Sequence, residues 1–184
     1  MTSYYAAAID SKTVIAGNLI GLLPDGVTRS PNDAYGLYIN ADGVRIGGSV
    51  PAERNVISGN NGHGLIFDGW GLNGVGNSVS GNYIGVGLDG TTVVANGGLG
   101  VFAAASGLLI GGLNTGGASG VAGAGNLISG NGVVGVEIAA GVSGVSLRGN
   151  FIGTDKTGTL ALKNHDQGVV VRGQQSTIGG SVAG

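Results

Sequence analysis

Three acidic residues lie at similar places in a repeated pattern and have the chemistry to bind a cation. Asp25, Asp89 and Asp155 each follow a copy of the motif Gly-Asn-x-Ile-Gly, and a Gly comes shortly after each of them. Carboxylate oxygens suit Ca²⁺ and also accept hydrogen bonds from sugar hydroxyls. Each loop offers only one carboxylate, however, and Asp-Gly is a frequent turn pair. We expect turn-forming residues here, with Ca²⁺ or ligand binding as the alternative, and otherwise no cofactor.

The two histidines are the candidates for acid–base catalysis. His63 lies between two glycines, and His165 precedes Asp166 in a polar cluster with Lys163 and Asn164. An imidazole titrates near neutral pH and can act as a general base. Hydrolysis of a glycosidic bond needs two carboxyl groups, and no Asp-Asp pair lies near His63 in the sequence. We therefore interpret both histidines as turn residues and assign no catalytic residue and no metal ligand.

Tyrosine and tryptophan side chains could stack on sugar rings if folding placed them on one face. They are Tyr4, Tyr5, Tyr35, Tyr38, Trp70 and Tyr83. Their spacing does not show whether they share a face, so a sugar-binding platform is a hypothesis that the sequence leaves open.

Charge and composition exclude several classes of function. The 184 residues carry a formal charge of −2 and only eight Lys and Arg, so there is no basic stripe to bind nucleic acid. No apolar run approaches the roughly 20 residues of a membrane span. The chain has no Cys, which excludes disulfides and zinc–thiolate sites. Its 42 Gly, set among short runs of Val, Ile and Leu, favour brief strands and tight turns.

A long repeat organises the whole chain and must position these side chains. Gly-Asn-x-Ile-Gly begins at Gly17, Gly81 and Gly149, which gives units of 64 and then 68 residues. Stacked repeats bury apolar rows that one repeat alone cannot bury. We predict an all-β, right-handed parallel β-helix. Dividing a unit by three suggests about three coils per unit, each of about 21 residues.

Asparagine recurs at fixed places within each unit. Because side-chain amides of stacked parallel strands bond to one another, we expect these residues to form a structural ladder along the axis. The predicted ladder residues are Asn18, Asn32, Asn60, Asn82, Asn96, Asn131, Asn150 and Asn164.

The motifs Asn-Val-Ile-Ser-Gly-Asn, Gly-Asn-x-Ile-Gly-Thr-Asp and Ile-Gly-Gly carry a family resemblance, best preserved from Gly149 to Thr159. They resemble the right-handed parallel β-helix repeats of large bacterial secreted and cell-surface proteins. The resemblance covers the whole chain and implies a pectate-lyase-like solenoid that acts as a stalk, adhesin or carbohydrate-facing surface. It also implies an extracellular or cell-surface location, although the first residues show no signal peptide.

The resemblance implies two alternative functions. The first is a structural or adhesive solenoid, and the second is a polysaccharide lyase, hydrolase or epimerase. Gly62-His63-Gly64 is similar to the Gly-His-Gly of polygalacturonases, and Arg148 and Arg172 could serve as the base of a pectate-lyase-like mechanism. The grouped acids that both mechanisms need are not evident. Such repeats occur with and without enzymatic activity, so we favour the first function.

We interpret residues 1–184 as a single solenoid segment, either part of a longer repeat array or a subunit that stacks end to end. Both ends fall inside a repeat unit: Ala7 aligns with Ala139, and Ile178-Gly179-Gly180 repeats the Ile-Gly-Gly at Ile46 without the strand that should follow. Open solenoid ends expose unpaired strand edges. We therefore expect homotypic end-to-end stacking or continuation in a longer chain, with polysaccharide as a further partner.

Overall fold

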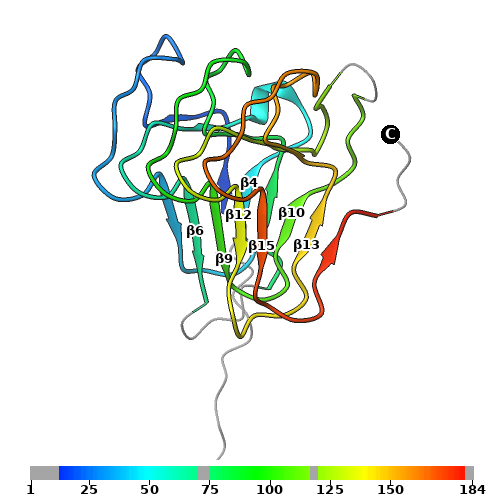
Figure 1. The fold of residues 1–184 in the computed structure, drawn as a ribbon. Helices are drawn as coiled ribbons and strands as arrows, with labels where there is room; N and C mark the ends of the chain where they lie inside the picture. Colours follow the sequence, from blue (N-terminus) through cyan, green and yellow to red (C-terminus); the bar gives the residue numbers. More distant parts are fainter. Residues whose placement is uncertain (1–12, 70–74, 117–119, 181–184) are drawn as a thin grey trace, which may run out of the picture.

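The computed structural model describes residues 13–69, 75–116 and 120–180, which form a parallel β-solenoid of about five turns (Figure 1). Short runs of Val, Ile and Leu between Gly and Asn favour brief strands joined by tight turns. The described residues include one short 3₁₀ helix, Pro51–Glu53, and no helix that is long and apolar enough to cross a membrane. The predicted all-β parallel solenoid is therefore confirmed.

Three parallel sheets form the walls of the solenoid, and each coil adds one strand to each sheet. The first sheet contains β1 (Val14–Ile15), β4 (Arg45–Gly47), β7 (Ser78–Ser80), β10 (Leu109–Gly111), β13 (Ser146–Arg148) and β16 (Thr177–Ile178). The second contains β2 (Leu19–Ile20), β5 (Val56–Ile57), β8 (Tyr83–Ile84), β11 (Leu127–Ile128) and β14 (Phe151–Ile152). The third contains β3 (Leu37–Ile39), β6 (Leu65–Asp68), β9 (Val101–Ala104), β12 (Val136–Ile138) and β15 (Val169–Val171).

The strand register corrects the predicted number of coils per unit. Leu19 of β2 pairs with Val56 of β5, which pairs with Tyr83 of β8. One 64-residue unit therefore makes two coils, of 37 residues (19 to 56) and 27 residues (56 to 83). The prediction of three coils of about 21 residues was wrong because it assumed coils of equal length.

The long coils owe part of their length to hairpins that project between the second and third sheets. Antiparallel bridges close these hairpins at Leu22 and Arg29, at Val86 and Val93, and at Thr154 and Ala161. The hairpins occur on every second coil and bond to one another: the N–H of Leu88 donates to the carbonyl of Gly26, and that of Lys156 to the carbonyl of Gly90, both at 2.9 Å. Pro24 holds the corresponding place in the first hairpin and has no N–H to donate.

Rows of apolar side chains fill the interior. In the first sheet Ile46, Val79, Ile110 and Leu147 lie in register, each no more than 3% exposed. Phe67 of β6 is the largest fully buried side chain. Burial of apolar surface contributes about 25 cal/mol per Å², so each added coil stabilises its neighbours.

Glycine is required where the chain leaves the second sheet. Gly85 has a φ of +90°, and a Cβ built on it would lie 2.2 Å from the carbonyl oxygen of Ser129 in the next coil. A side chain at this position would be strained by the backbone conformation and would clash with the stacked coil. The glycine of the repeated motif is thus explained by the close approach of successive coils.

Candidate functional site

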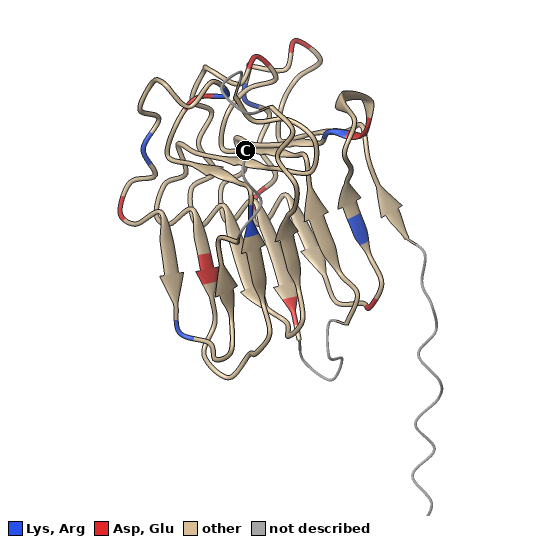
Figure 2. Ribbon diagram, turned by 90° about the vertical axis from the view of Figure 1, so that its right-hand side faces the viewer, with Lys and Arg blue, Asp and Glu red and all other residues tan. Residues whose placement is uncertain are grey.

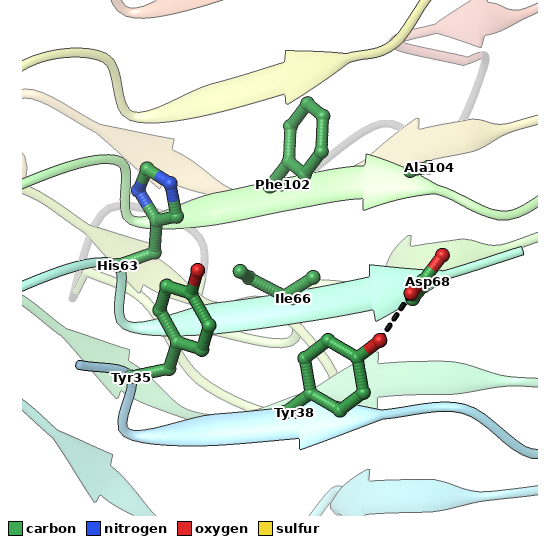
Figure 3. Close-up of a pocket in the computed structure, with 7 residues that line it drawn as sticks. All are labelled: Tyr35, Tyr38, His63, Ile66, Asp68, Phe102 and Ala104. Atoms are coloured by element: carbon green, nitrogen blue, oxygen red, sulfur yellow. Dashed lines mark hydrogen bonds between the residues drawn. The ribbon is translucent and has the colours of Figure 1, made fainter.

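A shallow hollow of about 250 Å³ lies on the outer face of the third sheet (Figure 3). In this sheet alternate side chains point outward, so residues 38, 66 and 102, which are in register on β3, β6 and β9, form an outward row. The residues that line the hollow are Tyr35, Tyr38, His63, Ile66, Asp68, Phe102 and Ala104. Three successive coils therefore contribute to one surface.

Four rings gather in this hollow. The planes of Tyr35 and His63 are within 3° of parallel with 5.6 Å between centroids, and those of Tyr35 and Tyr38 are within 19° at 6.2 Å. Phe102 continues the group on the next coil, 6.2 Å from His63. Tyr35 is 41% exposed and Tyr38 is 52% exposed. Figure 3 shows these rings beside one another over the strands.

An acidic side chain lies at one edge of the rings. The hydroxyl of Tyr38 donates a hydrogen bond to the carboxylate of Asp68, which belongs to the next coil (Figure 3). This hydrogen bond raises the pKa of Tyr38, and nearby Asp68 charge adds to the effect. The Tyr38 ring is thus held on the sheet with its oxygen turned toward the carboxylate.

His63 is held as a neutral imidazole. The backbone N–H of Leu99 donates to Nδ1 of His63 at 2.8 Å, so the ring proton is on Nε2. Partial burial of the ring lowers the pKa of His63, and the charge of Glu137 opposes this change. A neutral ring with one remaining donor suits contact with a polar ligand, and no second acid lies among the lining residues to support general acid–base catalysis.

The surroundings of the hollow contain few charges. No Lys or Arg lines it. On the next coils Arg172 donates to Glu137 at 3.0 Å, so this cation is already paired. Figure 2, which views the ribbon from another side, shows Lys, Arg, Asp and Glu scattered without a continuous stripe of either sign.

The acidic residues Asp25 and Asp89 close the turns of two hairpins. Oδ1 of Asp25 accepts the N–H groups of Val27 and Thr28, at 3.0 and 2.8 Å, and the Thr28 hydroxyl donates to Oδ2. These bonds, above all that of the Thr28 hydroxyl, lower the pKa of Asp25. Asp89 makes the same bonds with Thr91 and Thr92. Burial opposes its ionisation, yet these bonds outweigh burial and lower the pKa of Asp89 to about 2.

Asp155 does the same work from a different place. The residue that corresponds to Asp25 and Asp89 in the repeat is Thr157, and Asp155 lies two positions earlier. Its buried carboxylate accepts the Thr157 hydroxyl at 2.7 Å and the N–H groups of Thr159 and Leu160 at 3.0 and 3.1 Å. The Thr157 hydroxyl is the main cause of the lowered pKa of Asp155.

All three carboxylates are therefore engaged within their own turns. Among the described residues, no group of three or more His, Asp or Glu could hold a metal ion. Binding of Ca²⁺ at these loops stays a prediction, and the turn bonds account for the acids without it.

The predicted ladder asparagines lie in two separate files, which flank the second sheet. The first file consists of Asn18, Asn55, Asn82, Asn126 and Asn150, and the second of Asn32, Asn60, Asn96, Asn131 and Asn164. In the buried centre, Oδ1 of Asn82 accepts both the Nδ2 and the backbone N–H of Asn55, at 2.9 and 3.1 Å. Nδ2 of Asn82 donates to Asn126 and to the carbonyl of Ile46. These amides satisfy buried backbone groups as well as each other.

The remaining sequence candidates do not join the hollow. Tyr83 is 4% exposed and lies beneath Arg54, whose guanidinium carbon is 4.0 Å from the ring centroid. His165 is exposed and contacts only its neighbour Asp166, through Nδ1 at 3.0 Å. Arg148 is exposed on the first sheet. Tyr4, Tyr5 and Trp70 lie outside the described residues.

Sequence reasoning missed two members of the hollow, Phe102 and Asp68. Each carries a recognisable signal after the fact: Phe102 is the second residue after Gly100, as Tyr38 is after Gly36. Asp68 is the outward residue two places after Ile66.

Comparison with protein-family models, with curated protein sequences and with solved structures found no match.

Proposed function

We propose that this chain is a non-enzymatic, adhesive β-solenoid that binds polysaccharide through the ring-bearing hollow of the third sheet. The observation that carries the proposal is the gathering of Tyr35, Tyr38, His63 and Phe102 on one outer face, beside the carboxylate of Asp68. An exposed apolar patch with a polar rim marks an interaction site on a soluble protein.

Sugar rings match this combination of groups. Their C–H faces pack on the electron-rich faces of aromatic rings, and their hydroxyls donate hydrogen bonds to a carboxylate at the edge. The sheet is rigid because it is stacked on both sides, so the rings are placed before a ligand arrives. A shallow, open surface also suits a long polymer, which can extend beyond the three coils that form the hollow.

Affinity gel electrophoresis and calorimetry against a panel of plant, algal, fungal and bacterial polysaccharides test the proposal. We expect binding by the wild type and, for the double variant Tyr35→Ala and Tyr38→Ala, a loss of about tenfold, since each aromatic contact contributes about 0.5–1.5 kcal/mol. Leu160→Ala is the matched control, because Leu160 is 62% exposed on a hairpin and does not line the hollow. Absence of binding, or equal loss in the control, contradicts the proposal. Release of new reducing ends would favour an enzyme instead.

We also propose that the protein acts outside the cell or at the cell surface. The support is the resemblance of its repeats to those of secreted and cell-surface proteins, together with a ligand class that is abundant there. Protease treatment of intact source cells tests the location: we expect the protein to be digested while a cytoplasmic marker stays intact. Protection of the protein would count against an outer location.

End-to-end association with a second copy is a further proposal. It is supported by the sheet order, because within the described residues β1, β2 and β3 at one end and β14, β15 and β16 at the other have a strand neighbour on one side only. Open strand edges pair with other chains. Negative-stain microscopy and sedimentation across a range of concentrations should show rods that lengthen with concentration. A constant monomer would contradict this proposal and leave the hollow unaffected.

A further inference from the structure

We propose that the hollow selects uncharged polysaccharides and rejects polymers of uronic acids. This inference rests on the carbohydrate binding proposed above and names the ligand class. It is carried by the charges and hydrogen-bonding groups that line the hollow.

The charge of the hollow is negative and uncompensated by any lining cation. Asp68 is the one acidic residue that lines it, and none of its lining residues is Lys or Arg. The nearest ion pair described on the same face, Arg172 with Glu137 at 3.0 Å, carries no net charge. A uronate placed on the rings would therefore meet a like charge without a counter-charge, and like charges a few ångströms apart repel.

The hydrogen-bonding groups point to the same ligand class. The carboxylate of Asp68 can only accept, and it holds the hydroxyl of Tyr38 as a donor. Nδ1 of His63 is occupied by the N–H of Leu99, so this ring is a neutral donor rather than a cation. Neutral sugars bring hydroxyl donors to such a surface, whereas a uronate replaces one hydroxymethyl donor by a second acceptor.

The test compares each uronate polymer with its own carboxyl-reduced form, which has the same linkages and length. Polygalacturonate, polyglucuronate and polymannuronate are measured beside their reduced neutral partners by affinity electrophoresis at low salt. We expect at least threefold tighter binding of the neutral member in every pair that binds. Raising the salt concentration should narrow this ratio, because salt screens exposed charges, and this measurement needs no variant.

Asp68→Asn removes the charge and keeps an oxygen that can accept from Tyr38. We expect the ratio of neutral to acidic binding to fall toward one in this variant. Asp89→Asn makes the same change of charge in a hairpin outside the hollow and should leave the ratio as in the wild type.

The outcomes separate the two proposals. Binding of the acidic member as tightly as the neutral one, or more tightly, overturns the selectivity and leaves carbohydrate binding intact. A ratio that responds equally to both variants also overturns the assignment to Asp68. If no member of the pairs and none of the wider panel binds, carbohydrate binding itself fails, and the inference fails with it.

Discussion

The third sheet carries two different outer surfaces on one repeated backbone. In its first three coils the outward row is Tyr38, Ile66 and Phe102, while in the last two coils the same register positions are Glu137 and Val170. The inward neighbours change far less, because each of them must pack between the coils above and below.

The comparison separates what the repeat needs from what it permits. Inward side chains and ladder amides are constrained by close stacking, in which a change of one methylene group is felt. Outward side chains on β3, β6 and β9 face solvent and can depart from the pattern at little cost in stability. We infer that the function of this chain is located where its coils differ, and the following predictions test this.

The largest effect should come from the interior of the ring-bearing coils. Phe67→Ala removes a fully buried side chain and should lower the free energy of unfolding by about 3–5 kcal/mol. Phe102→Ala, on the adjacent strand but outward, should cost less than about 1 kcal/mol and weaken polysaccharide binding instead. Urea unfolding followed by circular dichroism measures both. Similar losses of stability would erase the distinction between the two faces.

A smaller loss should follow when an amide is removed from the centre of the first ladder. Asn82→Ala leaves the buried N–H and Nδ2 of Asn55 without their acceptor and should cost about 3 kcal/mol. Asn18→Ala, at the exposed end of the same file, should cost about 1 kcal/mol. Equal costs in urea unfolding would show that the ladder does not depend on burial.

The boundary between the two outer surfaces can be moved by one substitution. Glu137→Tyr adds a ring in register with Phe102 on the next coil and removes a negative charge. We expect polysaccharide binding to become about threefold tighter, as one added aromatic contact allows. Glu137→Gln removes the charge without adding a ring and should account for only part of the gain. Weaker binding by the tyrosine variant would place the ligand elsewhere.

The smallest effect concerns pH. Burial holds the pKa of His63 below that of an unfolded chain, which is about 6.5, so the stability due to its neutral form is fully present above that pH. It is lost as the pH falls through the folded-state pKa, because protonation at Nδ1 also breaks the bond from Leu99. The unfolding free energy should fall slightly between pH 7.5 and 5. His63→Gln should flatten this slope, and an unchanged slope would assign it to other groups.

Several features of the fold followed from the amino-acid pattern. The spacing of Gly17, Gly81 and Gly149 predicted a parallel stack, because only a repeated coil brings equivalent Ile and Val residues into register. The number of coils did not follow from it. Hairpins lengthen alternate coils, and their outward path leaves no mark on the period of the motif.

The hollow could not be derived from sequence for the same reason. Residues 38, 66 and 102 are 28 and then 36 residues apart, so only the observed register makes Tyr38, Ile66 and Phe102 neighbours. The sequence by itself determined the all-β repeat, the places that require Gly and Asn, and the absence of a basic surface, because these depend on local backbone conformation and composition. The tertiary structure alone decided which side chains share a face and which charges lie beside the rings, because these depend on how coils of unequal length align.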